Sequence, residues 1–153
     1  MYDQEGYYTI KLPDLRTCGT LEVTPKSPMR LRKAVERFAY YFHREMGFDF
    51  VQFVAADKTP NYITYIFFDE SRNVHCGACC FRWRKYTNHE PQWAMQWIWI
   101  HPYRRRSGIL KKHWPMFDKL RPFLLERPVS PAMQGFINKY NDGKLQVEPQ
   151  KNG

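Results

Sequence analysis

The stretch that decides the fold is WIWIHPYRRRSGILKKHW, residues 97–114. It begins as an almost continuous apolar run, turns at His101 and Pro102, passes through three arginines and one glycine, and then becomes basic and helix-compatible. This order predicts a buried strand that ends at the proline and turns into the start of a helix. Pro115 follows directly and predicts that the helix is kinked or split there.

A junction from strand through turn to helix is suited to binding phosphate. Unpaired N–H groups and the positive end of the helix dipole point outward at such a place, and Arg104, Arg105 and Arg106 add full charges. Gly108 allows the backbone to approach a ligand closely. The pattern leaves open whether the phosphates belong to a nucleic acid or to a small cofactor.

Three segments before the junction have high strand propensity and predict an antiparallel meander. They are YITYIFFDE (62–70), NVHCGACCFRW (73–83) and WAMQWIWI (93–100), joined by the polar turn DESRN and by the longer RKYTNHEPQ. The third segment is apolar on both faces, which places it in the middle of a covered sheet. Period-two alternation puts four of its side chains on one face: Trp93, Met95, Trp97 and Trp99.

Helices are predicted on either side of these strands. The first has Ser27 as N-cap, Pro28 as first residue, Gly47 just beyond its end, and an apolar face opposite a basic one. After the junction, PFLLE (122–126) predicts a short buried strand and SPAMQGFINKY (130–140) a helix that Ser130 caps. The predicted class is α+β (α/β), with a mixed, mostly antiparallel central sheet flanked by helices.

Length and composition set the limits of the interpretation. The 153 residues predict a single domain over 1–148 and a flexible tail over 149–153. The net charge of +9 predicts anionic partners without naming them. No apolar run approaches the roughly 20 residues that span a bilayer, and the first residues lack a secretion signal, so we expect an intracellular protein, cytoplasmic or nuclear, without a membrane partner.

The cluster HCGACC, residues 75–80, contains a C-x-x-C spacing that zinc sites use. On a strand, Cys76 and Cys79 are expected to point to opposite faces, and no second ligand pair follows. The sequence therefore favours reduced, buried thiols and no metal.

With these elements in place, the turn resembles the main motif of the GNAT superfamily of acyl-CoA-dependent N-acetyltransferases, a strand and proline turn followed by Q/R-x-x-G-x-G/A at the start of a helix. IHPYRRRSGIL supplies the strand end and Pro102, and its last six residues occupy the motif positions. The order of the surrounding elements also matches. Together with ERPVSPAMQGF (126–136), the motif is most similar to the cohesin-acetyltransferase branch.

The resemblance implies direct transfer of an acetyl group from acetyl-CoA to an amine, with a protein lysine or N-terminus, or a small amine, as acceptor. It assigns cofactor binding to the strand end and to the motif: Ile98, Trp99, Ile100, Arg105, Arg106, Ser107, Gly108, Ile109 and Leu110. Leu110 departs from the family, which has a small residue there, so the loop is expected to be tighter or shifted. Ser130 stands where the cohesin branch has an acidic residue.

Acetyl transfer needs a neutral amine, and a lysine is uncharged in only about one molecule in 2,500 at pH 7. Glu126, Asp69, Glu70 and His101 are candidate bases, and none is favoured by spacing. The hydroxyl that protonates the CoA thiolate resembles Tyr140 or Ser130, on the last helix. Backbone amides at the end of WIWIH could hold the oxyanion.

Two other functions remain open from the sequence. A non-catalytic nucleic-acid binder would use RWRKY (82–86), YRRR (103–106) and KKHW (111–114), where basic and aromatic residues interleave. A GNAT-shaped protein that has lost catalysis would instead bind a protein partner. The acceptor is not readable, because its pocket would be built from variable loops such as RKYTNHEPQ.

Overall fold

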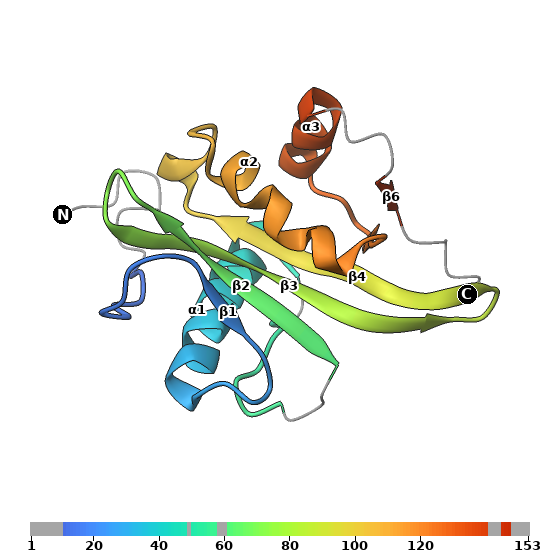
Figure 1. Cartoon of the computed structure of the whole chain (residues 1–153), viewed down its shortest axis with the longest axis horizontal. Helices are drawn as coiled ribbons and strands as arrows, with labels where there is room; N and C mark the ends of the chain where they lie inside the picture. The colour runs from blue at the N-terminus through green and yellow to red at the C-terminus, as the bar shows by residue number, and fades with distance from the viewer. Residues whose placement is uncertain (1–10, 49, 58–60, 141–144, 148–153) are drawn as a thin grey trace.

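A computed structural model of the chain describes residues 11–48, 50–57, 61–140 and 145–147, except for the side chain of Tyr140. These residues form one six-stranded sheet with helices on both faces (Figure 1). Helix α1 covers one face, and α2 and α3 cover the other, so a separate apolar core lies on each side of the sheet. The predicted tail at 149–153 lies outside the described residues.

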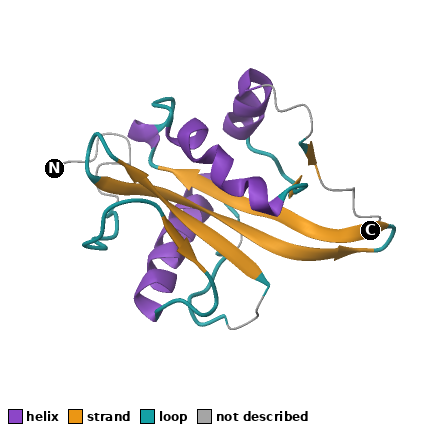
Figure 2. Ribbon diagram, viewed as in Figure 1, coloured by secondary structure: helices purple, strands orange, loops and turns teal. Residues whose placement is uncertain are grey.

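The sheet has its strands in sequence order, and Figure 2 shows how far its middle strands extend. The first four strands pair antiparallel, and the last two join in parallel. This confirms the predicted mixed, mostly antiparallel sheet. The strands are β1 (Leu21–Val23), β2 (Tyr62–Asp69), β3 (Val74–Tyr86), β4 (His89–Ile100), β5 (Leu124–Leu125) and β6 (Gln146–Val147).

The α-helices are α1 (Met29–Met46), α2 (Ile109–His113) and α3 (Pro131–Tyr140). Two 3₁₀ segments, Pro102–Arg104 and Trp114–Leu120, flank α2. Pro115 ends the α-helical hydrogen bonding as predicted, because it has no N–H to donate. Within the described ranges, no helix combines the length and apolarity that crossing a membrane requires.

Helix α1 packs the predicted apolar face on the sheet and ends at Gly47, whose φ of 73° is left-handed and whose N–H donates to the His43 carbonyl at 2.9 Å. The predicted Ser27 cap is wrong. Pro28 occupies the N-cap position, and the Ser27 hydroxyl instead accepts from the Thr24 N–H at 2.9 Å. The helix therefore begins without a side-chain cap.

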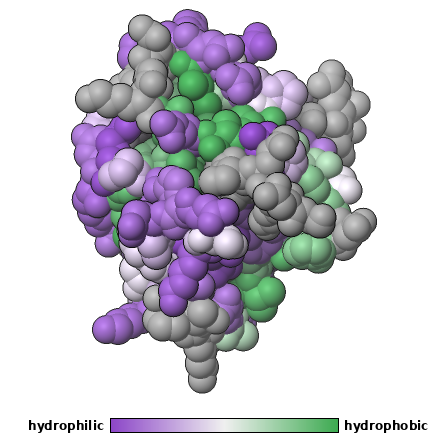
Figure 3. Space-filling view, turned by 90° about the vertical axis from the view of Figure 1, so that its right-hand side faces the viewer, coloured by the Kyte–Doolittle hydropathy of each residue, from purple (hydrophilic) through white to green (hydrophobic). Residues whose placement is uncertain are grey.

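The β3–β4 hairpin is longer than predicted. RKYTNHEPQ is no loop, because Arg84 pairs with Gln92 and Tyr86 with His89, which leaves a two-residue turn at 87–88. The face at this end of the molecule is mainly hydrophilic, with apolar side chains visible between the polar ones (Figure 3).

Residues 50–57, between α1 and β2, are irregular.

Of the three register shifts in the sheet, two are β-bulges that change which core side chains share a face. Cys80 pairs with Trp97 but Phe81 pairs with Met95, so Gln96 is an extra residue in β4. Trp97 and Trp99 consequently lie in the core under α1, whereas Met95 lies in the core under α2. The prediction that these side chains share one face was wrong, because a bulge reverses the alternation.

A second bulge lies at Cys76, since Phe67 pairs with Gly77 and Phe68 with His75. It places Cys76 and Cys79 in the same core cluster instead of on opposite faces. Burial raises the pKa of the Cys76 thiol to about 12. In the part of the chain that the structure describes, no group of three or more His, Cys, Asp or Glu side chains is arranged to hold a metal.

Candidate functional site

The edge of β4 is only partly covered by β5. The parallel pairing joins Ala94 to Leu124 and Met95 to Leu125, and the Glu126 N–H adds a hydrogen bond of 3.0 Å to the Met95 carbonyl. From 97 to 100, no described residue pairs as a strand with this edge. The end of β4 is therefore open where β5 has stopped.

The open edge presents backbone groups that a ligand could use. The His101 N–H donates to the Cys76 carbonyl, on the β3 side, at 2.8 Å. Because successive residues of a strand alternate in direction, the N–H and C=O groups of Ile98 and the N–H of Ile100 point to the opposite, open edge. The Ile100 carbonyl also points there, and it already accepts from Arg105 Nε at 2.7 Å. An extended molecule with amide groups could pair there as an added strand.

The other edge of β4 is held very close to β3. Gly77 pairs with Ile100, and a Cβ at position 77 would lie 2.3 Å from the Trp99 carbonyl oxygen. Only glycine allows this approach, which fixes the position of the strand end. A lone glycine inside a strand pattern was the sequence sign of this contact.

Beyond the strand, the turn carries two left-handed residues, Arg106 with φ 64° and Gly108 with φ 83°. A Cβ at Gly108 would meet nothing within 4 Å, so glycine serves the backbone conformation there and not the space. The first α-helical hydrogen bond joins the Lys112 N–H to the Gly108 carbonyl at 2.9 Å. The amides of residues 109–111 precede it and suit an anion. With five residues, α2 adds only a small dipole.

The side chain of Arg105 fixes the turn to the rest of the fold. Its Nε donates to the Ile100 carbonyl at 2.7 Å, and its Nη atoms bind both oxygens of Glu45 at 2.9 and 2.6 Å. The Trp99 indole N–H donates to the same carboxylate at 3.0 Å. Since Glu45 already pairs with the guanidinium, the Arg105 side chain holds the turn in place and is not a free phosphate ligand.

Among the neighbouring cations, Arg106 retains an unbalanced charge. Arg104 Nε lies 3.4 Å from an Asp69 oxygen, and Lys112 lies 2.9 Å from Glu70. Arg106 is exposed and makes no ion pair with a described residue.

The three remaining motif residues are Ser107, before Gly108, and Ile109 and Leu110, after it. Ile109 is buried in the core under α2. The Ser107 hydroxyl donates to the Arg104 carbonyl, and Leu110 is half-buried against the core under α2. Leu110 therefore anchors the loop to the core at the position where the family has a small residue.

The candidate bases all have partners. Arg84 binds both Glu126 oxygens, at 3.0 and 2.9 Å, and the Glu126 side chain is 13% exposed. Asp69 accepts from the Ser71 hydroxyl at 2.7 Å and pairs with Arg104. His101 Nδ1 accepts from the Tyr103 N–H at 3.1 Å, so the neutral ring has its proton on Nε2.

The two residues proposed to donate a hydroxyl proton lie at opposite ends of α3. Ser130 is the predicted N-cap, because its hydroxyl accepts from the Met133 N–H at 3.1 Å. Tyr140 is the last residue of the helix, and its side chain lies outside the described part of the structure. At about 1.5 Å per residue their backbones are roughly 15 Å apart.

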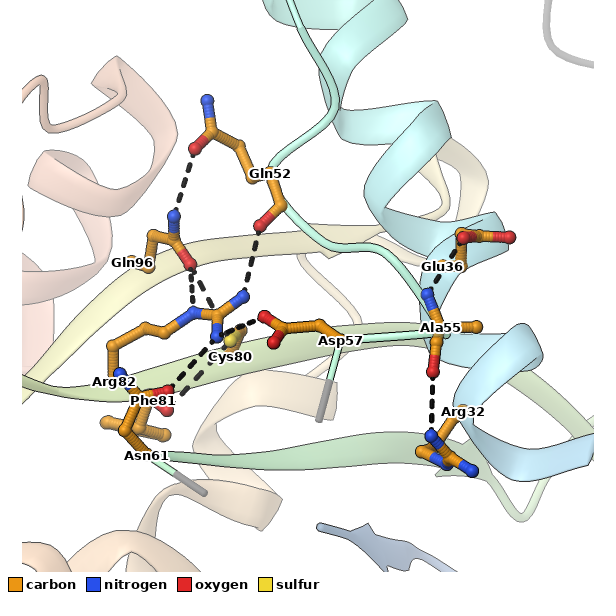
Figure 4. Close-up of polar contacts among 10 residues, drawn as sticks. All are labelled: Arg32, Glu36, Gln52, Ala55, Asp57, Asn61, Cys80, Phe81, Arg82 and Gln96. Atoms are coloured by element: carbon orange, nitrogen blue, oxygen red, sulfur yellow. Dashed lines mark hydrogen bonds and ion pairs between the residues drawn. The ribbon is translucent and has the colours of Figure 1, made fainter. Parts of the chain in front are cut away.

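The sequence analysis placed Arg82 in a nucleic-acid motif, RWRKY, and missed its structural role as a buried cation beside the β4 bulge (Figure 4). Its Nε donates to Gln96 Oε1 at 2.9 Å, and its other nitrogens lie 3.3 Å from Asp57 Oδ2 and 3.4 Å from the Gln52 carbonyl. Gln96 also donates to Gln52 Oε1 at 3.0 Å. The cluster ties the extra residue of β4 to the segment 50–57. A charged residue inside an otherwise apolar strand was the only sequence sign of it.

His113 holds α2 to the sheet as a neutral residue. Its Nδ1 donates to the Ile109 carbonyl at 2.7 Å, and its Nε2 accepts from the Thr20 hydroxyl at 2.6 Å. Burial lowers the pKa of His113 below its usual range, because the charged ring would lose its hydration.

Comparison with known proteins gives structural matches only. No protein-family model and no curated protein sequence matches the chain. The xEco2 acetyltransferase domain has a similar structure, with TM-score 0.58, 16% identity, and coverage of 79% of this chain and 84% of that one. The same domain bound to a CoA conjugate gives TM-score 0.58, 19% identity, and coverage of 79% and 86%.

An aminoglycoside acetyltransferase from an uncultured soil metagenomic sample, in complex with sisomicin, gives TM-score 0.55 at 12% identity and covers 88% of this chain and 91% of that one. These likenesses show the fold: the chain has the architecture of the GNAT acetyltransferases, as its motif implied.

Proposed function

We propose that this protein is an acetyl-CoA-dependent N-acetyltransferase whose acceptor is a protein lysine or N-terminus. The observation that carries the proposal is the open edge of β4, with its outward amides and carbonyls, directly beside the turn at 105–110. The pantetheine arm of CoA contains amides that suit the edge at Ile98 and Ile100. Its pyrophosphate suits the amides of residues 109–111 and the exposed Arg106. The structural likeness to acetyltransferases supports the same ligand.

Bound acetyl-CoA would supply a thioester whose acetyl group an amine can attack directly. The end of β4 would orient this group, and a backbone amide there would stabilise the oxyanion. The departing thiolate would take a proton from Ser130 or from Tyr140, the two hydroxyl residues that the resemblance implies. Glu126 could accept the amine proton, because each of its oxygens accepts one hydrogen bond from Arg84 and keeps a second acceptor site.

The structure does not favour the rival in which RWRKY, YRRR and KKHW form one nucleic-acid surface. Trp114 is 2% exposed and cannot stack on a base. Arg82, Arg84 and Arg105 bind carboxylates within the fold. Trp114 and these three arginines therefore serve the protein's own packing.

Calorimetric titration with acetyl-CoA tests the proposal with a matched pair, Gly108→Asp and Gly108→Asn. Both side chains tolerate a left-handed φ, and a Cβ at this position has free space, so the variants differ mainly by one charge. We expect wild-type binding, and an affinity at least about fivefold lower for Asp than for Asn, from repulsion of the pyrophosphate. Absence of wild-type binding would overturn the proposal. Equal affinities of the two variants would exclude phosphate binding at this turn.

The acceptor is tested separately by intact-mass measurement. Peptides with one lysine, with a free N-terminus, or with neither are incubated with acetyl-CoA and the protein. We expect the mass of one acetyl group to be added to a peptide that has an amine and not to the blocked control. Acetyl-CoA binding without transfer to any amine would instead support the hypothesis of a GNAT-shaped protein that has lost catalysis.

A further inference from the structure

The outward face of α1 carries a continuous basic stripe. Its positions are spaced three and four residues apart, so they lie above one another on one side of the helix. Its fifteen residues, 30 to 44, rise about 21 Å along the helix, and the exposed Lys26 continues it into the preceding turn. All its members are exposed, and we define the α1 stripe as Arg30, Lys33, Arg37, Tyr40 and Arg44.

The α1 stripe is not neutralised by the protein. None of its cations forms an ion pair with a described residue. The acidic residues of the helix are used elsewhere, because Glu36 accepts from the Ala55 N–H at 2.8 Å and Glu45 binds Arg105. Arg44 lies over the ring of Tyr40, at 5.9 Å from its centroid. The stripe thus presents positive charge together with one exposed aromatic ring.

The charges of the α1 stripe lower the stability of the helix. Like charges three and four residues apart repel one another. Arg30 and Lys33 also lie near the positive end of the helix dipole, where no acidic residue and no side-chain cap compensates them. The apolar face under the sheet keeps the helix folded. Local features that oppose stability in this way are typical of functional surfaces.

The chemistry of the α1 stripe selects one class of anionic partner. A protein interface needs a buried apolar centre, and Tyr40 is the sole large apolar side chain of the stripe. A membrane-surface helix needs a free apolar face, and that of α1 is packed on the sheet. A phosphodiester chain offers closely spaced charges for the cations and bases for the ring. We propose that the α1 stripe binds the phosphate backbone of a nucleic acid.

The proposal is independent of acetyl transfer and is tested by fluorescence anisotropy. The probes are a DNA duplex of about 20 base pairs and one of its two strands. Each is titrated with the protein at several salt concentrations. The stripe variant is Lys33→Gln, Arg37→Gln and Arg44→Gln. The control variant changes the net charge equally at exposed cations elsewhere: Arg72→Gln, Lys85→Gln and Lys139→Gln. Circular dichroism and thermal unfolding check that both variants are folded.

We expect wild type to bind at least one probe, and the stripe variant to lose at least about tenfold in affinity at about 0.1 M salt. Its slope of log affinity against log salt should fall by about 2 to 3, from the loss of three phosphate contacts. The control variant should change much less. Tighter binding of the single strand would indicate that the Tyr40 ring contacts unpaired bases. Tighter binding of the duplex would indicate that the stripe contacts mainly the phosphates of paired DNA.

Three results would overturn the proposal. The first is that the wild type binds neither probe. The second is that the stripe variant and the control variant lose affinity equally, which would mean that net charge alone is responsible. The third is competition by a polyglutamate peptide as effective as that by unlabelled DNA at equal charge, which would identify an acidic protein segment as the ligand instead.

Discussion

Replacing Arg82 by methionine should destabilise the protein strongly. The Arg82 side chain is 9% exposed, and its partner Asp57 is 28% exposed. The variant would remove the hydrogen bonds that Arg82 donates to the Asp57 carboxylate, Gln96 Oε1 and the Gln52 carbonyl. Removing one partner of a buried ion pair costs about 3 to 5 kcal/mol, and the partial exposure of Asp57 indicates the lower end, about 3 kcal/mol.

Urea denaturation and thermal unfolding measure this cost. For a domain of this size, 1 kcal/mol corresponds to about 2–4 °C, so the melting temperature should fall by roughly 6–12 °C. The matched control is Lys112→Met, which removes a pair whose side chains are 52% and 72% exposed and should cost less than about 1 kcal/mol. Arg82→Lys should be intermediate, because an ammonium cannot reproduce the forked contacts. A loss for Arg82→Met no larger than that of the control would refute the reasoning.

Three further predictions follow from single positions. Gly77→Ala should cost about 1–3 kcal/mol in urea denaturation, because its Cβ would lie 2.3 Å from the Trp99 carbonyl oxygen; a cost below about 0.5 kcal/mol would contradict that close approach. The lowered pKa of His113 means that the unfolded chain takes up a proton first as pH falls through about 6.5. The free energy of unfolding should therefore decrease below that pH, with a smaller slope in His113→Asn; an unchanged slope would exclude His113 as a cause. Arg106→Gly should raise the free energy of unfolding by about 1 kcal/mol, because glycine relieves a left-handed φ of 64°. The same variant should weaken acetyl-CoA binding, and an unchanged affinity would show that Arg106 does not contact the ligand.

The fold was largely predictable because its signals are local. The apolar periodicity of α1, its end at Gly47 and the break at Pro115 each depend on neighbouring residues. The bulges at Cys76 and Gln96 were not predictable, since an extra residue leaves no trace in strands that are apolar on both faces. They reversed the expected faces of the side chains that follow.

The candidate site was predictable in its backbone and not in its side chains. The turn, Gly108 and the capping role of Ser130 follow from short-range pattern. The ion pair between Arg105 and Glu45 joins positions 60 residues apart, and it changed the interpretation of Arg105 from a free phosphate ligand to a structural anchor. Only the three-dimensional arrangement shows that Arg104 and Arg105 pair with carboxylates, whereas Arg106 pairs with none among the described residues.

Backbone hydrogen exchange with and without acetyl-CoA tests the central claim most directly. If the open edge of β4 and the following turn bind the ligand, acetyl-CoA should slow exchange at the amides of Ile98 and Ile100 and of residues 106–111. Exchange along α1, away from Glu45, should change little. Protection that is absent from both the edge and the turn, or confined to other elements, would contradict the account.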